Sequence, residues 1–464
     1  MKTSNPTIES LIKIIEAQAA QIKQLEARIQ ELEQRLNKNS SNSSKPPSSD
    51  GLSKPPRTTS LRENGKNKSG GQAGHKGETL KQTETPDIVK KHILTTCPDC
   101  QHSLLQSPLL NVVKRQVFDI PAPKIEVTEH QAEIKYCPCC NKTITAAFPP
   151  EVRAPVQYGE VIRSWSVYYQ YQHFIPEDRL QQLFSDLYGI QVATATLAGY
   201  NRIAFDALAP FEESILALVK TAAVKNLDET GFRVAGKTQW LHVASTKNAT
   251  YYHVSPKRKS LIDGLSGTVV HDHWKSYYNL FGVEHGLCNQ HHLRELKAII
   301  DHDKEPWAND MRRLLRVMLR CRHFHGSNAI PSERIKWLTK IYDKIIKQGL
   351  VFHTAQTPLP CKSKQSRQPR RTGHNLLLRL FHYKQDVLRF LHDPDVPFTN
   401  NDAERDLRMM KCKQKISGGF RTSQGALQFA RIRGFISTVR KRGLNVLNSI
   451  EAIFSDSIPI PAGS

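Results

Sequence analysis

Residues 223–234 read AVKNLDETGFRV, a short apolar strand that is interrupted by the carboxylate of Asp228. Aspartate is unfavourable within a strand. Its position just before the Thr230-Gly231 turn is explained if the side chain faces solvent, caps a turn or holds a cation. A turn aspartate is the most common of these alternatives, so this stretch alone leaves the role of Asp228 open.

Two later stretches repeat this arrangement of a carboxylate at the end of an element. Residues 268–274, TVVHDHW, form a β-branched segment that reaches Asp272, and residues 399–405, TNNDAER, open a helix with acids in its first turns. Carboxylates that meet from separate elements can hold two divalent metal ions for phosphoryl transfer. The recurrence therefore favours a metal-binding role for Asp228.

The composition favours a partner that is rich in phosphate. The 464 residues include 66 Lys and Arg against 43 Asp and Glu, which gives a formal net charge of +23. Polyanion binding rests on contacts from Lys and Arg to phosphate and on counterion release, so nucleic acid is a better match than an acidic small molecule. Ribosomal, membrane-surface and simply soluble basic proteins remain alternatives. No stretch has the length of a transmembrane run, and the first residues lack the pattern of a signal peptide.

The N-terminal segment has the spacing of a coiled coil. Apolar residues recur alternately every three and four residues, with Ile mainly at a positions and Leu mainly at d positions, which favours a parallel dimer. The seam positions are Ile8, Leu11, Ile15, Gln18, Ile22, Leu25, Ile29, Leu32 and Leu36. The polar Gln18 is a candidate for setting the register. One long amphipathic helix docked on its own protein is the alternative.

Two Cys-x-x-Cys pairs among nine cysteines favour metal ligation in a reducing compartment over a disulfide framework. The paired thiols are Cys97, Cys100, Cys137 and Cys140, and Cys139 is a spare thiol beside the second pair. Four thiolates suit a closed, tetrahedral, structural zinc site, with a redox motif as the alternative. Alternation over residues 112–120 and 124–128 predicts the two strands of a hairpin that carries both pairs.

Residues between Pro155 and Pro210 have helical periodicity. Leu180, Leu183 and Phe184 fall on one face of a predicted helix, residues 189–192 form a turn that begins with glycine, and residues 194–202 predict a second helix. This is the shape of a DNA-binding helix-turn-helix and also of any αα-hairpin, so both alternatives stay open.

The segment after Asp228 is rich in predicted strands. The predicted elements are, in order, strands over 239–245 and 250–254, a short crossover helix over 259–265 and a parallel strand over 268–274. Three meandering strands, a helix and a parallel strand form the core of an RNase H-like fold. Its first and fourth strands are neighbours, which would bring Asp228 and Asp272 to one edge. Residues 296–397 then predict an all-α insertion.

The motifs taken together resemble those of a known family. They are, in chain order, residues 42–50 (NSSKPPSSD), residues 71–77, the two cysteine pairs, residues 227–230 (LDET), 271–274 (HDHW), 400–405 (NNDAER) and 417–422 (SGGFRT). From about residue 39 to about residue 454 the chain resembles the transposases of the insertion sequence sixty-six type, a branch of the DDE transposases. The resemblance implies that Asp228, Asp272 and Glu404 are the catalytic acids, that they bind Mg²⁺ or Mn²⁺, and that the substrate is double-stranded DNA. Ala73 stands where the family often has proline, and Cys139 is an additional cysteine.

Two acids compete for the third position. At about 100° per residue, Ala403, Leu407 and Met410 share the helix face that would pack on the sheet. Glu404 lies on one side of this stripe, in a cluster with Arg408 and Lys411, and is the predicted metal ligand. Asp402 lies on the other side, just past an Asn cap, and is predicted to complement the helix dipole. The alternative for Glu404 is an ordinary surface pair with Arg408.

A basic segment and a Cys-x-x-His motif are further candidate sites. From residue 405 to residue 442 there are eleven Lys and Arg against one acid, which predicts a phosphate-binding surface. The predicted DNA-binding residues are Arg408, Lys411, Lys413, Lys415, Arg421, Arg431 and Arg433. Cys288 and His291 lie at a predicted strand-to-helix junction and resemble a pattern of related transposases. Two ligands alone do not make a zinc site, so a buried structural pair is at least as well supported, with His292 as the rival histidine.

The sequence thus predicts a multidomain α+β protein that acts as a DNA transposase by metal-dependent cleavage and strand transfer at the ends of an insertion sequence. Its predicted parts are a coiled coil (1–37), a flexible basic linker (38–92), a zinc-ribbon-like domain (93–150), a helix-turn-helix-like domain (151–210), the RNase H-like core (211–295 and 398–454) around a helical insertion (296–397), and a tail (455–464). A non-catalytic, zinc-containing DNA-binding regulator and an RNase H-fold nuclease are the alternatives. We expect self-association through the coiled coil and a cytoplasmic, nucleoid-associated location in a prokaryote, away from membranes. A requirement for helper proteins stays open.

Overall fold

The computed structural model describes residues 8–36, 80–359, 368–455 and 457. Most of the predicted linker therefore lies outside the described residues. Residues 80–129 belong to one compact unit, and the described residues on either side belong to another. Among the described helices, none combines the length and the apolar character that a bilayer crossing needs.

The sheet of the larger unit has five strands in the order β5-β4-β3-β6-β7. The strands are β3 (Val224–Val234), β4 (Lys237–Ser245), β5 (Thr250–Ser255), β6 (Gly267–His271) and β7 (Val283–Leu287). The first three pair antiparallel as a meander, whereas β6 pairs parallel with both β3 and β7. The predicted strands over 239–245 and 250–254 are confirmed, and so is the parallel pairing of the first strand with the fourth. The predicted turn at Thr230-Gly231 is wrong, because β3 continues through both residues in its pairing with β4, and the fourth strand ends at His271, before Asp272.

The predicted crossover helix over residues 259–265 is wrong. The chain from β5 to β6 is irregular there, because Ser266 donates its backbone N–H to Lys220 O and Gly264 and Gly267 both have positive φ. Gly267 has φ +70°, and a Cβ at this position would lie 2.5 Å from the carbonyl oxygen of Ala223. Only glycine accepts that close approach, so β6 begins at a fixed point beside the start of β3.

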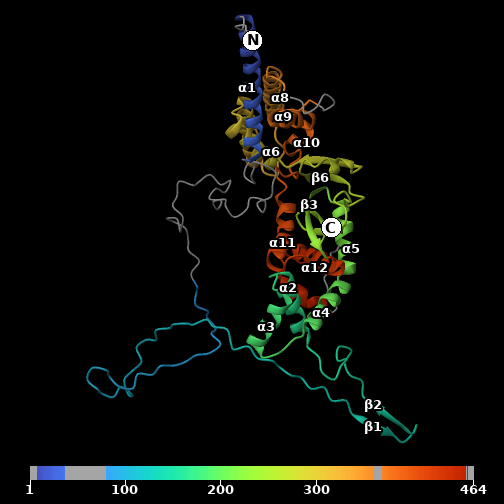
Figure 1. Ribbon diagram of the computed structural model, residues 1–464. Coiled ribbons are helices and arrows are strands. Elements are labelled where there is room, and N and C mark those ends of the chain that lie inside the picture. The colour runs from blue at the N-terminus through green and yellow to red at the C-terminus, as the bar shows by residue number, and fades with distance from the viewer. Residues whose placement is uncertain (1–7, 37–79, 360–367, 456, 458–464) are drawn as a thin grey trace, which may run out of the picture. The chain divides into compact units, whose positions relative to one another are not determined.

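Helices from distant parts of the chain pack on this sheet. Figure 1 shows α11 alongside β3, although nearly 170 residues separate them in the sequence, and α11 contacts β4 as well. The helices α12 and α5 contact β5, and α10 contacts β7. Their bounds are α5 (Ala209–Thr221), α10 (Lys384–His392), α11 (Asn401–Ser417), α12 (Ser423–Lys441) and, after them, α13 (Val446–Phe454).

A second hydrophobic core joins the helical insertion to the far edge of the sheet. Val270 of β6 and Leu287 of β7 belong to the same buried cluster as Leu296, Met311 and Leu377 of the insertion. The helices are α6 (Asn289–His302), α7 (Pro306–His325), α8 (Ser332–Thr354), α9 (Thr372–His382) and α10. The prediction that residues 296–397 are almost wholly helical is confirmed for the described residues.

A helix–turn–helix segment precedes the sheet. It consists of α3 (Glu177–Tyr188) and α4 (Thr194–Ala207), with α2 (Glu160–Tyr171) packed on both. Gly189 ends α3 in the left-handed conformation, with φ +69°, which is the usual place for glycine at a helix C-terminus. Leu180 and Phe184 of α3 and Leu197 of α4 are buried, so the predicted pair of helices is confirmed, while its DNA-binding role stays a prediction.

The N-terminal and cysteine-containing segments have little buried surface of their own. The helix α1 (Ile8–Leu36) exposes apolar seam residues such as Ile15 and Ile22. The predicted strands over 112–120 and 124–128 are wrong: these described residues form no strand, and apolar side chains such as Val117 are exposed. Alternation predicts a strand only where one face packs on a core, and here no such core covers it. The observed hairpin is β1 (Ile134–Cys137) with β2 (Lys142–Thr145).

Candidate active site

Asp228 and Asp272 lie just beyond the last residues that pair with each other in two neighbouring parallel strands, β3 and β6. Asn226 of β3 is in register with Val270 of β6, so Asp228 and Asp272 each follow two residues after this pair. Because parallel strands present their carboxyl ends at the same edge, the two acids come together there. This arrangement follows from the strand order rather than from proximity in the sequence.

Helix α11 adds Glu404 to the same edge. Ala403, Leu407 and Met410 are buried against the sheet, as the periodicity predicts. Glu404 flanks this stripe and is partly buried. Asp402 lies on the opposite flank with a side chain that is 41% exposed, and it pairs with Arg405 at 3.4 Å. The packing of one apolar stripe therefore directs one acid to the site and leaves the other at the surface.

The three carboxylates share one electrostatic environment. Burial raises the pKa of Asp228 well above its usual range, and the negative charges of Glu229, Asp272 and Glu404 raise it further. Burial also raises the pKa values of Asp272 and Glu404, and in each case a nearby arginine opposes the shift. Like charges that are gathered and desolvated are unfavourable unless a cation neutralises them. The site therefore has the electrostatics of a divalent-metal site.

Asn400 holds the elements of the site together, whereas sequence reasoning predicted only a helix cap at this position. Its side chain does not cap α11. Instead, Nδ2 donates to Leu227 O at 2.7 Å, and Oδ1 accepts from Asn226 Nδ2 at 2.9 Å. Its backbone N–H donates to Cys288 Sγ at 3.2 Å. Asn400 is 1% exposed and so fixes the start of α11 against β3 beside Asp228.

A second buried group lies next to the acids. Glu229 accepts hydrogen bonds from Arg258 Nε at 2.9 Å, from Arg258 Nη2 at 2.6 Å and from the hydroxyl of Tyr277 in the 3-10 helix η2 (Lys275–Asn279). The Arg258 guanidinium also lies over the rings of Trp274, at 4.2 Å, and Trp240, at 5.1 Å. Sequence reasoning missed this cluster because Arg258 and Glu229 are 29 residues apart in the chain, and no local pattern pairs them.

A cavity of about 220 Å³ opens beside Asp272. Its lining residues include Arg258, His273, Cys288, His291, Glu295 and Arg379. Burial raises the pKa of the Cys288 thiol to about 11 and lowers the pKa of His291 to about 3. His292 instead contacts Asn289 Oδ1 through Nδ1 at 3.0 Å, so His291 is the histidine that lies with Cys288.

The predicted DNA-binding cations fall into three groups. Arg408, Lys415 and Arg421 are exposed. Lys411 donates to Gly231 O at 2.8 Å, and the Lys413 ammonium lies 4.0 Å from the ring centre of Phe420.

Arg431 and Arg433 face the interior of the protein. Arg431 pairs with Glu212 at 2.7 Å, and Arg433, which is 2% exposed, donates to Gln172 and to Tyr171 O. These contacts assign both guanidinium groups to the packing of α12 rather than to a phosphate-binding surface. DNA contact is therefore expected from the exposed cations. The prediction included Arg431 and Arg433 because a count of basic residues along a helix does not separate its buried face from its exposed face.

Each cysteine pair forms a turn within its own unit. In the first, Gln101 donates its N–H to Cys97 O, and hydrogen bonds from the Cys100 and Asp99 backbone lower the pKa of Cys97. In the second, hydrogen bonds from the Cys140 and Cys139 backbone lower the pKa of Cys137 in the same way. Both turns thus favour thiolates, the form in which cysteine ligates metals.

Comparison with known families fits these features. The model of the transposase IS66 family matches residues 155–428, which include all three acids. The chain belongs to the IS66 family of transposases. The model of the zinc-finger binding domain of transposase IS66 matches residues 95–141, which include both cysteine pairs, and residues 2–81 match a family of unknown function.

One curated relative is itself uncharacterised. The IS66-family chain is 38% identical over 79 residues to the uncharacterized protein y4jO of Sinorhizobium fredii. The match covers 16% of this chain and 25% of the relative. The shared segment supports common descent and carries no statement about activity.

Proposed function

We propose that this IS66-family protein is a DNA transposase that cleaves phosphodiester bonds at the ends of an insertion sequence and joins those ends to target DNA. The observation that carries the proposal is the placement of Asp228, Asp272 and Glu404 near one sheet edge, where burial and the charges of Glu229, Asp272 and Glu404 raise the pKa of Asp228. Three carboxylates that repel one another in a partly buried site are a poor structural element and a good cation site.

The donor set fits Mg²⁺ or Mn²⁺, because hard divalent cations prefer carboxylate oxygens. The Oε1 atom of Glu404 is buried and has no hydrogen-bond partner among the described residues, as expected of an atom that serves a ligand. When bound, two such ions supply Lewis-acid stabilisation to the attacking and leaving oxygens of an in-line displacement. Asp228, Asp272 and Glu404 would hold them, and Asn400 would keep Glu404 in position.

The fold supports this chemistry. The strand order, with an antiparallel meander followed by parallel β6 and β7, fits an RNase H-like core whose second and third acids are separated by an all-α insertion. The irregular segment in place of the crossover helix is a departure from the expected pattern. The connection from β5 to β6 supplies Arg258, which pairs with Glu229 beside the acids.

DNA contact is proposed for two surfaces. Helices α3 and α4 have the size and turn of a helix-turn-helix. The exposed Arg408, Lys415 and Arg421 lie on or after α11, the helix that carries Glu404. Since phosphate contacts position a protein on a duplex, these cations would align DNA along the helix that supplies the third acid. A DNA substrate in turn suggests action on the nucleoid, in the cytoplasm of a prokaryote.

A structural zinc ion is proposed for Cys97, Cys100, Cys137 and Cys140. The zinc-finger family match and the lowered thiol pKa values of Cys97 and Cys137 support this ligand set. Self-association is proposed through α1, because its exposed Ile and Leu residues follow the heptad spacing of a parallel dimer.

The test of the proposed function is an in vitro reaction on DNA that carries the inverted repeats flanking the gene. With Mg²⁺, we expect nicks at the element ends and joined products, both abolished by chelation. Asp272→Asn should slow cleavage by roughly 1,000-fold or more, or about 4 kcal/mol of barrier. The exposed Asp263 provides the matched control, since Asp263→Asn should cleave at the wild-type rate. Wild-type cleavage by Asp272→Asn would contradict the proposal.

A further inference from the structure

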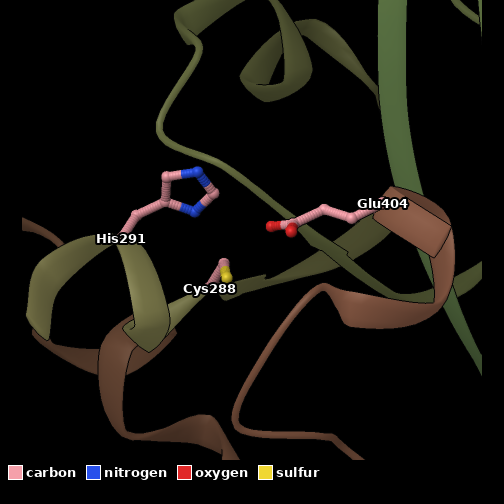
Figure 2. A group of neighbouring side chains, drawn as sticks. All are labelled: Cys288, His291 and Glu404. Atoms are coloured by element: carbon pink, nitrogen blue, oxygen red, sulfur yellow. The ribbon is translucent and has the colours of Figure 1, made fainter. Parts of the chain in front are cut away.

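Cys288, His291 and Glu404 form a cluster whose composition differs from that of the carboxylate site. One ligand atom from each residue lies within 4.8 Å of the others. Figure 2 shows the Glu404 carboxylate, from α11, pointing toward the Cys288 thiol and the His291 ring at the start of α6. Elements that are more than 100 residues apart in the sequence thus present sulfur, nitrogen and oxygen donors to one point.

Two atoms of this cluster lack partners in the part of the chain that the structure describes. His291 Nδ1 and Glu404 Oε1 are both buried without a hydrogen bond. The Arg294 Nη2 atom is 3.8 Å from Glu404 Oε1, beyond hydrogen-bonding distance. Leaving a buried polar atom unpaired costs about 1–3 kcal/mol, so two such atoms beside one thiol favour the binding of a ligand at this point.

The chemistry of the three donors selects the class of ligand. Thiolate, imidazole and carboxylate are the donors of zinc sites, and three protein ligands leave a fourth position open. Mg²⁺ prefers oxygen donors and is poorly matched to sulfur and nitrogen. Tetrahedral zinc bonds place donor atoms about 3.3–3.8 Å apart, so a side-chain shift of about 1 Å would close the cluster around an ion.

The cavity beside Asp272 gives this point an entry path. Cys288 and His291 both line it, although Cys288 is 1% exposed. Its volume of about 220 Å³ has room for a water molecule at the open position. Asn400 donates its backbone N–H to Cys288 Sγ at 3.2 Å, which orients the sulfur and stabilises its thiolate form.

We propose that Cys288, His291 and Glu404 form a binding site for a thiophilic divalent cation of the Zn²⁺ class, and that an ion bound there withdraws Glu404 from the Mg²⁺ site. The second half of this proposal rests on the proposed function. Glu404 has one carboxylate and serves both sites, so occupancy of one site weakens the other. Zinc would then act as a reversible inhibitor of cleavage.

The first test is the zinc content of the full-length, reduced protein after dialysis against buffered Zn²⁺. Cys288→Ser and His291→Gln should each hold one zinc fewer per chain than the wild type, with affinity at this site reduced by more than roughly 100-fold. Cys412→Ala, which removes an exposed thiol from the same helix as Glu404, should keep the wild-type content. Equal zinc content in the wild type and in both folded ligand variants would overturn the proposal.

A second measurement needs no variant. X-ray absorption at the zinc edge of the wild-type protein should give a shell that mixes sulfur with nitrogen and oxygen, whereas a sulfur-only shell would overturn the proposal.

A third measurement tests the link to Glu404. Zinc should slow Mg²⁺-dependent cleavage by the wild type by a larger factor than it slows cleavage by His291→Gln, each relative to its own zinc-free rate. Equal factors would contradict the link to Glu404. If the protein binds zinc but neither the wild type nor any variant cleaves DNA, the proposed function is contradicted and the proposed zinc site is still supported.

Discussion

The sheet edge and the cysteine turns are both candidate metal sites, yet the protein builds them in opposite ways. Asp228, Asp272 and Glu404 are positioned by a five-stranded sheet, buried helices and the side chain of Asn400. The cysteine turns lie in segments whose apolar side chains are largely exposed, such as Val117 and Ile134. A site that rests on a core persists without its ion, whereas a site without a core depends on its ion for folding. We therefore expect metal removal to unfold the cysteine turns and to leave the sheet folded.

The largest expected effect is on the cysteine turns. Chelation of zinc should make residues 80–145 sensitive to protease while the sheet stays resistant, because structural zinc contributes about 10–16 kcal/mol in small zinc domains. Cys137→Ser should have the same effect, and Cys139→Ser, which removes the spare thiol, should not. Mass spectrometry of the fragments gives the sites of cleavage. Resistance of Cys137→Ser to protease would show that this segment has a core after all.

The next largest effect concerns Asn400, whose side chain links the start of α11 to β3. Asn400→Ala leaves Leu227 O and Asn226 Nδ2 without their buried partner, so the free energy of unfolding should fall by about 2–4 kcal/mol. Asn401→Ala, at the adjacent exposed position, should stay within about 0.5 kcal/mol of the wild type. Denaturant unfolding measures both. Equal stability of the two variants would contradict a stabilising role for the Asn400 side chain.

A smaller effect should appear in the pH dependence of stability without metal. The pKa of Asp228 is higher in the folded state than in the unfolded state. Its contribution to the free energy of unfolding is therefore fully present below the unfolded-state pKa and is lost as the pH rises through the folded-state pKa. Asp228→Asn removes this loss, so its melting temperature should exceed that of the wild type by an amount that grows with pH. A difference of 1 kcal/mol corresponds to about 2–4 °C in a domain of this size. Mg²⁺ should reduce the difference, and Asp263→Asn should not produce it.

The smallest effect belongs to Asp402. Its exposed pair with Arg405 and its place in the first turn of α11 are each worth a few tenths of a kcal/mol. Asp402→Asn should therefore lower stability by less than about 1 kcal/mol. A loss as large as that of Asn400→Ala, measured by the same unfolding curves, would give Asp402 a role that its exposure does not explain.

The sequence predicted the sheet edge well and its supports poorly. Alternation and β-branched runs identified the strands, and the helical period placed Glu404 beside the buried stripe of Ala403, Leu407 and Met410. These signals are local. The bonds of Asn400 to β3 and of Glu229 to Arg258 join residues that are distant in the chain, and nothing in the local pattern specifies them.

The errors have a related cause. Alternation over residues 112–120 predicted a strand, but it carries no information on whether a core exists to cover it. Counting cations between residues 405 and 442 likewise did not separate the exposed Arg408 from Arg433, whose guanidinium packs inside. Burial depends on what tertiary structure places against a residue, and one-dimensional patterns give that only where a periodic face is continuous.

The assignment of Asp228 and Glu404 as metal-binding acids is tested by Mg²⁺-dependent strand cleavage by Asp228→Asn and Glu404→Gln, with Asp402→Asn as the matched control from the first turn of α11. We expect the first two variants to bind DNA as the wild type does and to lose cleavage by roughly 1,000-fold or more, while Asp402→Asn cleaves at nearly the wild-type rate. Wild-type cleavage by Asp228→Asn, or loss of cleavage in Asp402→Asn with activity retained in Glu404→Gln, would contradict the assignment.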